Sequence, residues 1–176
     1  MATAIAALLL LAACSSNKPA ENPGASSSAP SSASTPSSAP ETLTPVNATA
    51  VVAGLTSAGF TCGTDEAYAA CTSEGAVVSI LLGDHPRPPV VSVNAAGPVD
   101  TASAAIAKVL PKALEVAHIS QPGDIVTWYG AQKGKPSAEM TAGDWLVSYA
   151  AETDTEEPGV HLTITDKLCK TACQAE

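Results

Sequence analysis

Apolar positions recur with helical spacing just after position 44. They lie at i, i+3, i+4 and i+7, which is one face of a helix, and they are Ala48, Val51, Val52 and Leu55. Thr44-Pro45 has the form of an N-cap followed by proline at the first helical position. Gly59 supplies a C-terminal stop. The pattern predicts a first helix between Thr44 and Gly59.

Runs of β-branched residues bounded by Gly, Asp and Pro predict strands in the next part of the chain. In two further segments near the end, apolar positions recur at every second residue, and an acidic hairpin over 153–159 joins them. Since 77–82 is almost continuously apolar, we expect it to be a central strand with both faces covered. The predicted strands are Tyr68 to Thr72, Val77 to Leu82, Val90 to Ala95, Trp145 to Glu152 and Val160 to Thr165.

Two helices are predicted between the third and fourth strands. Asp100-Thr101 caps the first of them, and Pro111 is expected to kink or split it because proline removes a hydrogen bond and clashes with the preceding turn. The segment Asp124 to Gln132 has strand-forming residues but also a helical stripe, and we predict a helix. The fold class is therefore α+β in the order α-β-β-β-α-α-β-β. About five antiparallel strands would carry two to three helices on one face.

Composition divides the chain. Between Ser15 and Val46, 24 of 32 residues are Ser, Thr, Pro or Ala, so this stretch has little to bury and predicts a disordered tether. All six aromatic residues lie between positions 60 and 149. We expect residues 14–43 to be a tether and residues 44–176 to be a single domain.

The first residues have the character of an export signal. Ala2 to Ala13 is apolar or small except at Thr3, and it is too short to span a bilayer as a helix. Leu11-Ala12-Ala13-Cys14 resembles the bacterial lipobox, which implies cleavage before Cys14 and lipidation of its thiol. No Lys or Arg precedes this stretch, although signal peptides carry a positive n-region. Either the signal peptide over 1–13 is truncated and its true start lies upstream of Met1, or the stretch is not a functional signal. The predicted location is extracytoplasmic, with a lipid anchor in the cell membrane.

Charge restricts the partners. The net charge is −9, and from Val46 onward there are seven Asp, eight Glu, six Lys and one Arg. No basic run exists to neutralise phosphates, which argues against nucleic acid as a partner. The same acidity argues against attraction to anionic lipid, so membrane contact is expected only through the anchor. An envelope protein or a glycan is the expected partner.

Four cysteines remain beyond Cys14, and an even number in an exported protein indicates disulfides. Cys62 and Cys71 flank a polar turn that suits a local bridge, which would leave Cys169 and Cys173 to pair. In a regular helix the last two side chains would diverge too far, so cross-pairing stays open. The alternative function for Cys169 and Cys173 is a thiol or copper site, because soft thiolates favour Cu(I).

Other chemical candidates are isolated. The loop Asp84-His85-Pro86-Arg87-Pro88-Pro89 is rigid and charged, and Asp84, His85 and Arg87 form a candidate contact surface. A turn whose prolines block edge pairing explains the same residues. His118 and His161 have no neighbours at metal-ligand spacing, so we predict neither metal nor cofactor.

Catalytic motifs are missing from the sequence, which has no G-x-S-x-G, no phosphate-binding glycine loop and no H-E-x-x-H. A small hydrolase built around His85 or His161 is therefore the weakest alternative, and no catalytic residue is assigned. Four aromatic residues are expected in the core, although partial exposure would make a ligand-binding face: Trp128, Tyr129, Trp145 and Tyr149.

The order of parts resembles uncharacterised actinobacterial lipoproteins. The resemblance rests on the lipobox, the tether, Ala58-Gly59-Phe60-Thr61-Cys62, a second cysteine nine positions on, and the late Gly-Asp-Trp-Leu-Val-Ser-Tyr segment. It implies no activity and carries over no functional residue. The leading hypothesis is a non-enzymatic binding or accessory module of the cell envelope.

Overall fold

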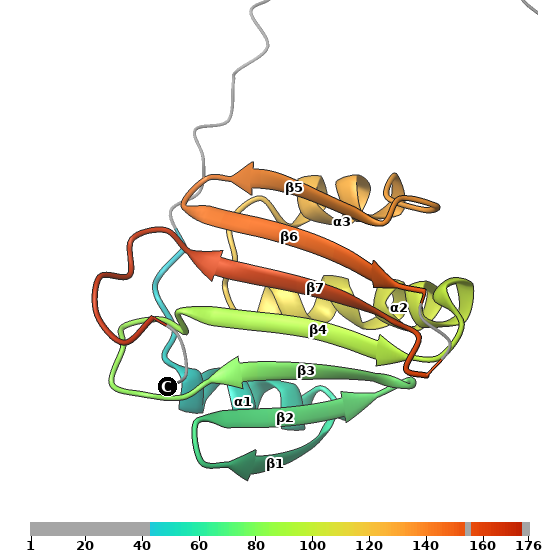
Figure 1. Ribbon diagram of the computed structural model, residues 1–176. Helices are drawn as coiled ribbons and strands as arrows, with labels where there is room; N and C mark the ends of the chain where they lie inside the picture. Colours follow the sequence, from blue (N-terminus) through green and yellow to red (C-terminus); the bar gives the residue numbers. More distant parts are fainter. Residues whose placement is uncertain (1–42, 154–155, 174–176) are drawn as a thin grey trace, which may run out of the picture. The chain divides into compact units, whose positions relative to one another are not determined.

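The computed structural model describes residues 43–153 and 156–173, which form one antiparallel sheet with helices packed on one face (Figure 1). The seven strands lie in the order β1-β2-β3-β4-β7-β6-β5. The elements are α1 (Ala48–Ser57), β1 (Thr61–Asp65), β2 (Tyr68–Ser73), β3 (Ala76–Leu81), β4 (Val90–Ala96), α2 (Val99–Val116), α3 (Pro122–Gly130), β5 (Ser137–Ala142), β6 (Trp145–Glu152) and β7 (Gly159–Asp166). The predicted α+β class with an antiparallel sheet is confirmed.

The prediction of about five strands was wrong, because β1 and β5 were missed. Both are edge strands, so each pairs along one side only: β1 with β2, and β5 with β6. Apart from Met140 in β5 their residues are small or polar, and four of the five in β1 are exposed. A strand with so little to bury has no clear apolar alternation, and its neighbour's backbone determines its conformation.

The first helix is confirmed, but its start was misplaced. The N-cap is Asn47 rather than Thr44, and its side-chain oxygen accepts a hydrogen bond from the backbone N–H of Ala50 at 2.9 Å. At the other end, Gly59 has a φ of +92°. Glycine adopts that backbone conformation without strain, so the chain turns there into β1.

The second helix is continuous through Pro111, contrary to the expected break. It runs from Val99 with Pro98 as its N-cap residue, so Asp100 lies in the first turn and not at the cap. Pro111 is exposed, whereas Leu110 and Leu114 are fully buried. Burial of the opposite face outweighs the one hydrogen bond that proline removes. The ambiguous segment after it forms α3, which confirms the helix prediction.

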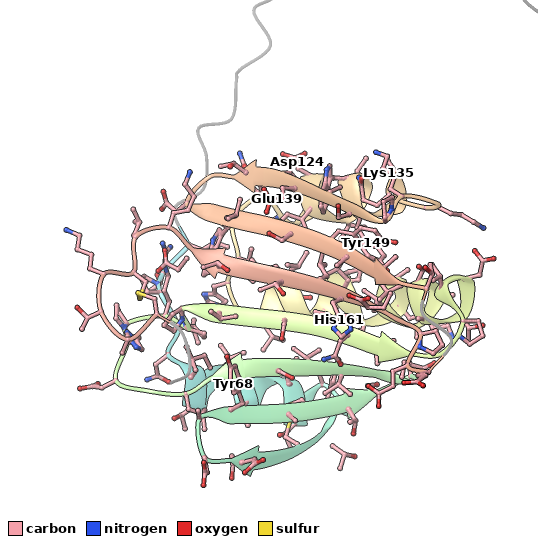
Figure 2. The ribbon with its side chains drawn as sticks, in the orientation of Figure 1. Tyr68, Asp124, Lys135, Glu139, Tyr149 and His161 are labelled. Atoms are coloured by element: carbon pink, nitrogen blue, oxygen red, sulfur yellow. A yellow bond between two sulfur atoms is a disulfide. The ribbon has the colours of Figure 1, made fainter. Side chains whose placement is uncertain are left out.

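The core lies between the sheet and the three helices. It combines one face of the strands with the apolar sides of the helices, and it includes Leu55, Ile106, Leu110, Ile125, Trp145, Leu162 and Ile164. The opposite face of the sheet is largely polar, although Val77 and Leu146 also lie on it, and Figure 2 shows Glu139 and His161 there. In the sheet register, Ser79, Ser92, Thr163 and Ser148 form one row across it. No helix among the described residues has both the length and the apolar character needed to cross a membrane.

Candidate functional site

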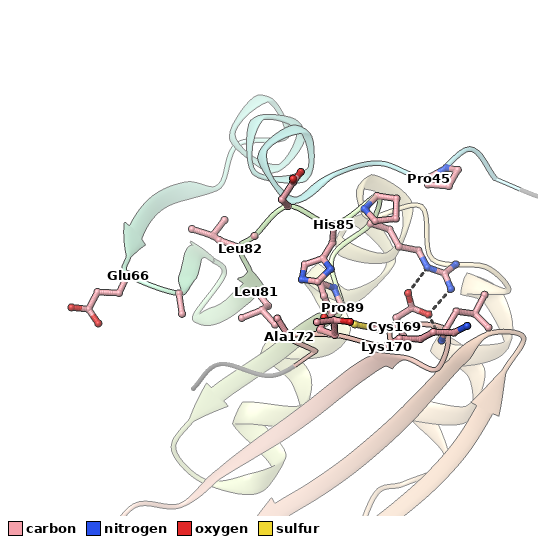
Figure 3. A pocket seen from close by; sticks show the side chains of 17 residues that line it. Pro45, Glu66, Leu81, Leu82, His85, Pro89, Cys169, Lys170 and Ala172 are labelled. Carbon is pink, nitrogen blue, oxygen red and sulfur yellow. Dashed lines mark hydrogen bonds and ion pairs between the residues drawn. The ribbon is translucent and has the colours of Figure 1, made fainter.

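A cleft of about 1110 Å³ lies where the β3–β4 loop meets the segment that follows β7 (Figure 3). We call it the strand-end cleft. Apolar residues make up much of its wall: Pro45, Ala67, Leu81, Leu82, Pro86, Pro89, Leu168 and Ala172. Its polar side chains include all three residues of the predicted contact surface, which are Asp84, His85 and Arg87. The structure therefore brings these three together with residues from the far end of the chain.

Arg87 joins the two sides of the cleft. Its Nε and Nη2 donate to the two carboxylate oxygens of Asp166 at 2.7 and 2.5 Å. A second carboxylate, on Asp144, lies 3.8 Å from Nη2, and the guanidinium sits 4.6 Å from the ring centroid of Trp145. Asp166 is 7% exposed at its side chain, and Arg87 is 19% exposed. This bidentate, largely buried pair is an inter-loop cross-link.

The electrostatics of the pair favour its charged form. Hydrogen bonding to Asp166 raises the pKa of Arg87 above its usual value, although burial works against this. Burial alone would raise the pKa of Asp166, but hydrogen bonds from Arg87 and from the backbone N–H of Leu168 outweigh it and lower that pKa. Neither group is poised to exchange a proton near neutral pH. The pair therefore positions the cleft walls and does not act as an acid or base.

His85 lies inside the cleft, where Figure 3 shows its ring between the two walls. A Coulombic interaction with His85 is the smallest of the causes that lower the pKa of Asp166. The chain reaches this position through Gly83, which has a φ of +141°. A Cβ at Gly83 would lie 3.1 Å from Cδ2 of His85, so glycine is needed for both the turn and the close approach.

The cysteines form two local disulfides. Cys62 and Cys71 face each other across β1 and β2 with Cα atoms 3.9 Å apart, and the buried Cys71 ties this edge of the sheet to the core. Cys169 and Cys173 pair at a Cα separation of 5.8 Å. They can do so because the segment after β7 is not helical, which removes the divergence expected of a helix. This second bridge closes the loop that forms one wall of the strand-end cleft.

The histidines do not gather into a reactive site. His118 follows α2, and its Nδ1 is 2.8 Å from the backbone carbonyl oxygen of Thr44. His161 is exposed on the polar face of the sheet, away from the helices (Figure 2). Among the residues that the structure describes, no group of three or more His, Cys, Asp or Glu is arranged to hold a metal ion. Cys14, the predicted lipidation site, lies outside the described residues.

Sequence reasoning found one wall of the cleft and missed the other. Asp166, Leu168 and Lys170 belong to the site, but Arg87 and Asp166 are 79 positions apart. One feature of the sequence could have pointed to Asp166. Arg87 is the one Arg in an acidic domain, and a buried Arg needs a carboxylate partner.

The chain matches no family model, no curated protein and no solved structure. The fold and the cleft themselves define a small α+β domain with two disulfides. Its strand-end cleft is built largely from the β3–β4 loop and the segment after β7.

Proposed function

We propose that the protein is a non-enzymatic binding module of the cell envelope, and that its strand-end cleft binds a short extended segment of a partner protein. One observation carries the proposal: the cleft is large and apolar-walled, and both of its walls are cross-linked. The Arg87–Asp166 pair joins the two walls to each other, and the Cys169–Cys173 bridge closes the loop that forms one of them. A preformed cleft saves the cost of ordering loops on binding.

Exposed apolar surface supports a protein ligand. Leu168 is 59% exposed, and Leu43 is the other large hydrophobic residue that is exposed in the described part of the chain. Leu168 stands at the cleft, where contact with a partner would remove it from water. A glycan fits less well, since sugar rings stack on aromatic faces and the cleft is lined by no Phe, Tyr or Trp.

Charge indicates the character of that segment. The chain has a net charge of −9, and Glu66 and Asp84 stand on the cleft. Arg87 cannot offset them, because Asp166 already pairs with it, and Lys170 is the one other Lys or Arg on the cleft, so the two carboxylates outnumber it. We therefore expect a partner segment with apolar side chains flanked by Lys or Arg, which the acidic surface would attract before contact.

The proposed location follows from Cys14 and gains support from the disulfides, which persist in oxidising compartments. The test expresses the full chain with a basic n-region added before residue 1, in cells that are given radiolabelled palmitate. The protein should take up the label. Cys14→Ala should abolish that label and release the protein from the membrane fraction. Equal labelling of the two forms would refute the anchor.

The cleft is tested by photo-crosslinking in intact cells. A benzophenone amino acid replaces Leu168, and in a control protein it replaces Ser57, which is exposed at the end of α1. The partner segment that crosslinks to position 168 but not to position 57 is identified and made as a synthetic peptide. This peptide is then titrated against the purified domain. Leu168→Asp should weaken its binding at least about tenfold, as expected for a central apolar contact, whereas Leu43→Asp should not. Equal binding by both variants, or no capture specific to position 168, would refute the proposal.

A further inference from the structure

The two disulfides of the domain differ in their surroundings. Cys62–Cys71 lies inside the sheet, where it links β1 to β2, and Cys71 is 0% exposed. Cys169–Cys173 links residues four positions apart in a segment that forms neither helix nor strand. Neither Cys169 nor Cys173 belongs to the hydrophobic core. The second bridge therefore ties no core element to another, and the stability of the sheet does not account for it.

The second bridge lies on the strand-end cleft. One stretch of chain lines the cleft without interruption, and Figure 3 labels Cys169, Lys170 and Ala172 along it. The neighbours of Cys169 in this stretch are exposed, and Cys169 itself is half-buried. Cys173 does not line the cleft. A molecule held in the cleft therefore meets Cys169 and not Cys173.

The loop that this bridge closes contains a strained residue. Ala172 has a φ of +51°, a left-handed conformation that costs alanine free energy because its Cβ crowds the following carbonyl oxygen. Opening the bridge would let Ala172 relax, so the strain favours reduction. Glu66, between Cys62 and Cys71, also has a positive φ, of 37°. It lies in the turn between β1 and β2, where the strand ladder holds the backbone whether or not that bridge is closed.

Positive charge surrounds the second bridge in an otherwise acidic chain. Lys170 stands between the two cysteines in the sequence, and Lys167 precedes them. The nearby carboxylate of Asp166 does not offset these lysines, because it pairs with Arg87. A neighbouring cation favours a thiolate over a thiol. Since a thiolate is the leaving group when a disulfide is attacked, this charge speeds exchange. Exposed or strained disulfides are also those that exchange most readily.

We propose that Cys169–Cys173 is an exchangeable disulfide, and that its substrate is a cysteine pair in the protein segment bound in the strand-end cleft. This inference rests on the proposed function. A thiolate of the partner attacks Sγ of Cys169 and forms a new S–S bond, while the bond to Cys173 breaks and Cys173 leaves as a thiolate that takes up a proton. The partner's second thiolate then attacks its own sulfur in the mixed disulfide and displaces Cys169. The partner becomes a disulfide, and the two electrons it loses reduce Cys169 and Cys173.

The reactivity of the bridge is tested in glutathione buffers of increasing reducing strength. The full-length protein carries Cys14→Ser, so that only the two pairs contribute thiols, and alkylation followed by peptide mass measurement reports each pair. Cys169–Cys173 should open in buffers that leave Cys62–Cys71 closed. Ala172→Asn should lower the equilibrium constant for its reduction about threefold, because Asn tolerates the left-handed conformation without loosening the open loop as Gly would. Opening of both pairs together, or no effect of Ala172→Asn, would overturn the proposal.

The substrate is tested with two synthetic peptides that have the same charge. Each has Lys at both ends and one cysteine activated as a thionitrobenzoate disulfide; leucines flank the cysteine in the first peptide and serines in the second. Cys173→Ser leaves Cys169 as the free thiol on the cleft, and Cys169→Ser leaves Cys173. Released thionitrobenzoate reports formation of the mixed disulfide. Cys169 should react at least about tenfold faster with the leucine peptide, as expected for a central apolar contact, whereas Cys173 should show no preference. Equal rates of Cys169 with both peptides would overturn the proposal.

Photo-crosslinking from position 168 needs no thiol chemistry, so it separates this inference from the proposed function. Capture from position 168 together with a Cys169–Cys173 bridge that resists glutathione as strongly as Cys62–Cys71 would overturn the exchange and leave the binding module intact. No capture specific to position 168 would refute the binding on which the exchange depends, and would overturn both.

Discussion

The Arg87–Asp166 cross-link is the feature whose removal tests the structure most directly. We choose Asp166→Asn because it keeps the size of the side chain but removes the charge that both nitrogens of Arg87 contact. Arg87 would keep only Asp144, at 3.8 Å and 54% exposed. Breaking a buried pair by removing one partner costs about 3–5 kcal/mol, and we expect about 3 kcal/mol here because Arg87 is partly exposed.

The assay is a double-mutant cycle by urea or thermal unfolding. The second variant is Arg87→Met, which keeps an apolar stem against Trp145. For a domain of this size, about 3 kcal/mol corresponds to a fall of roughly 10 °C in melting temperature. The coupling energy between the two positions should be about 2 kcal/mol.

A matched control is available on the surface of α2. Lys112 and Glu115 are 2.6 Å apart, closer than many buried pairs, but they are 47% and 68% exposed. Their coupling in the same cycle should be at most about 0.5 kcal/mol, because water screens the pair. The contrast tests burial rather than distance as the source of stability. A coupling below 0.5 kcal/mol at Arg87 and Asp166 would refute the reasoning.

The same pair makes a prediction about pH. The pKa of Asp166 is lowered in the folded state, so the unfolded chain binds more protons as the solution becomes acid. Its contribution is complete above the unfolded pKa of about 3.9 and is lost as pH falls through the lower folded value. Wild-type stability should therefore fall more steeply below about pH 5 than that of Asp166→Asn. Parallel curves would contradict the assignment.

The remaining predictions concern packing, cross-links and one further titration. Replacing Cys62 and Cys71 with Ser should cost about 2–3 kcal/mol in chemical unfolding, because a short closed loop is released; no loss would contradict the bridge. Gly159→Ala should destabilise the domain by about 1–3 kcal/mol, since the new Cβ would lie 2.9 Å from the backbone oxygen of Ala95. Pro111→Ala should stabilise it by about 1–2 kcal/mol by restoring a helical hydrogen bond. Because the pKa of Tyr129 is raised to about 12, stability should fall as pH rises from about 10 to 12, and Tyr129→Phe should remove that fall.

Local pattern was enough for the helices and the inner strands. The stripe in α1 and the alternation in β6 and β7 each report which side of a segment is buried. The apolar run over 77–82 was misleading: both of its faces were expected to be covered, but Val77 and Ser79 of β3 are only half-buried, on the face of the sheet away from the helices. A residue three or four positions away on a helix, or two away on a strand, carries that information, so the sequence contains it directly. Even the ambiguous stretch that became α3 was decided correctly by its stripe of apolar residues.

Partners far apart in the chain were decided by the tertiary structure. The edge strands β1 and β5 exist because β2 and β6 offer backbone hydrogen bonds, and their own side chains give little sign of it. Pro111 was expected to split α2 because proline is a local helix breaker, but burial on the other side of α2 overrides this and the helix runs through it.

The strand-end cleft shows the same division at the level of function. Asp84, His85 and Arg87 were chosen from the sequence as a contact surface, yet Asp166 and Leu168, which complete the strand-end cleft, entered only with the fold. The sequence by itself determined the acidity, the even set of cysteines and the periods of the main elements. Which side chains meet depends on sheet register and helix packing, and these arise from burial summed over the whole core rather than from any one segment.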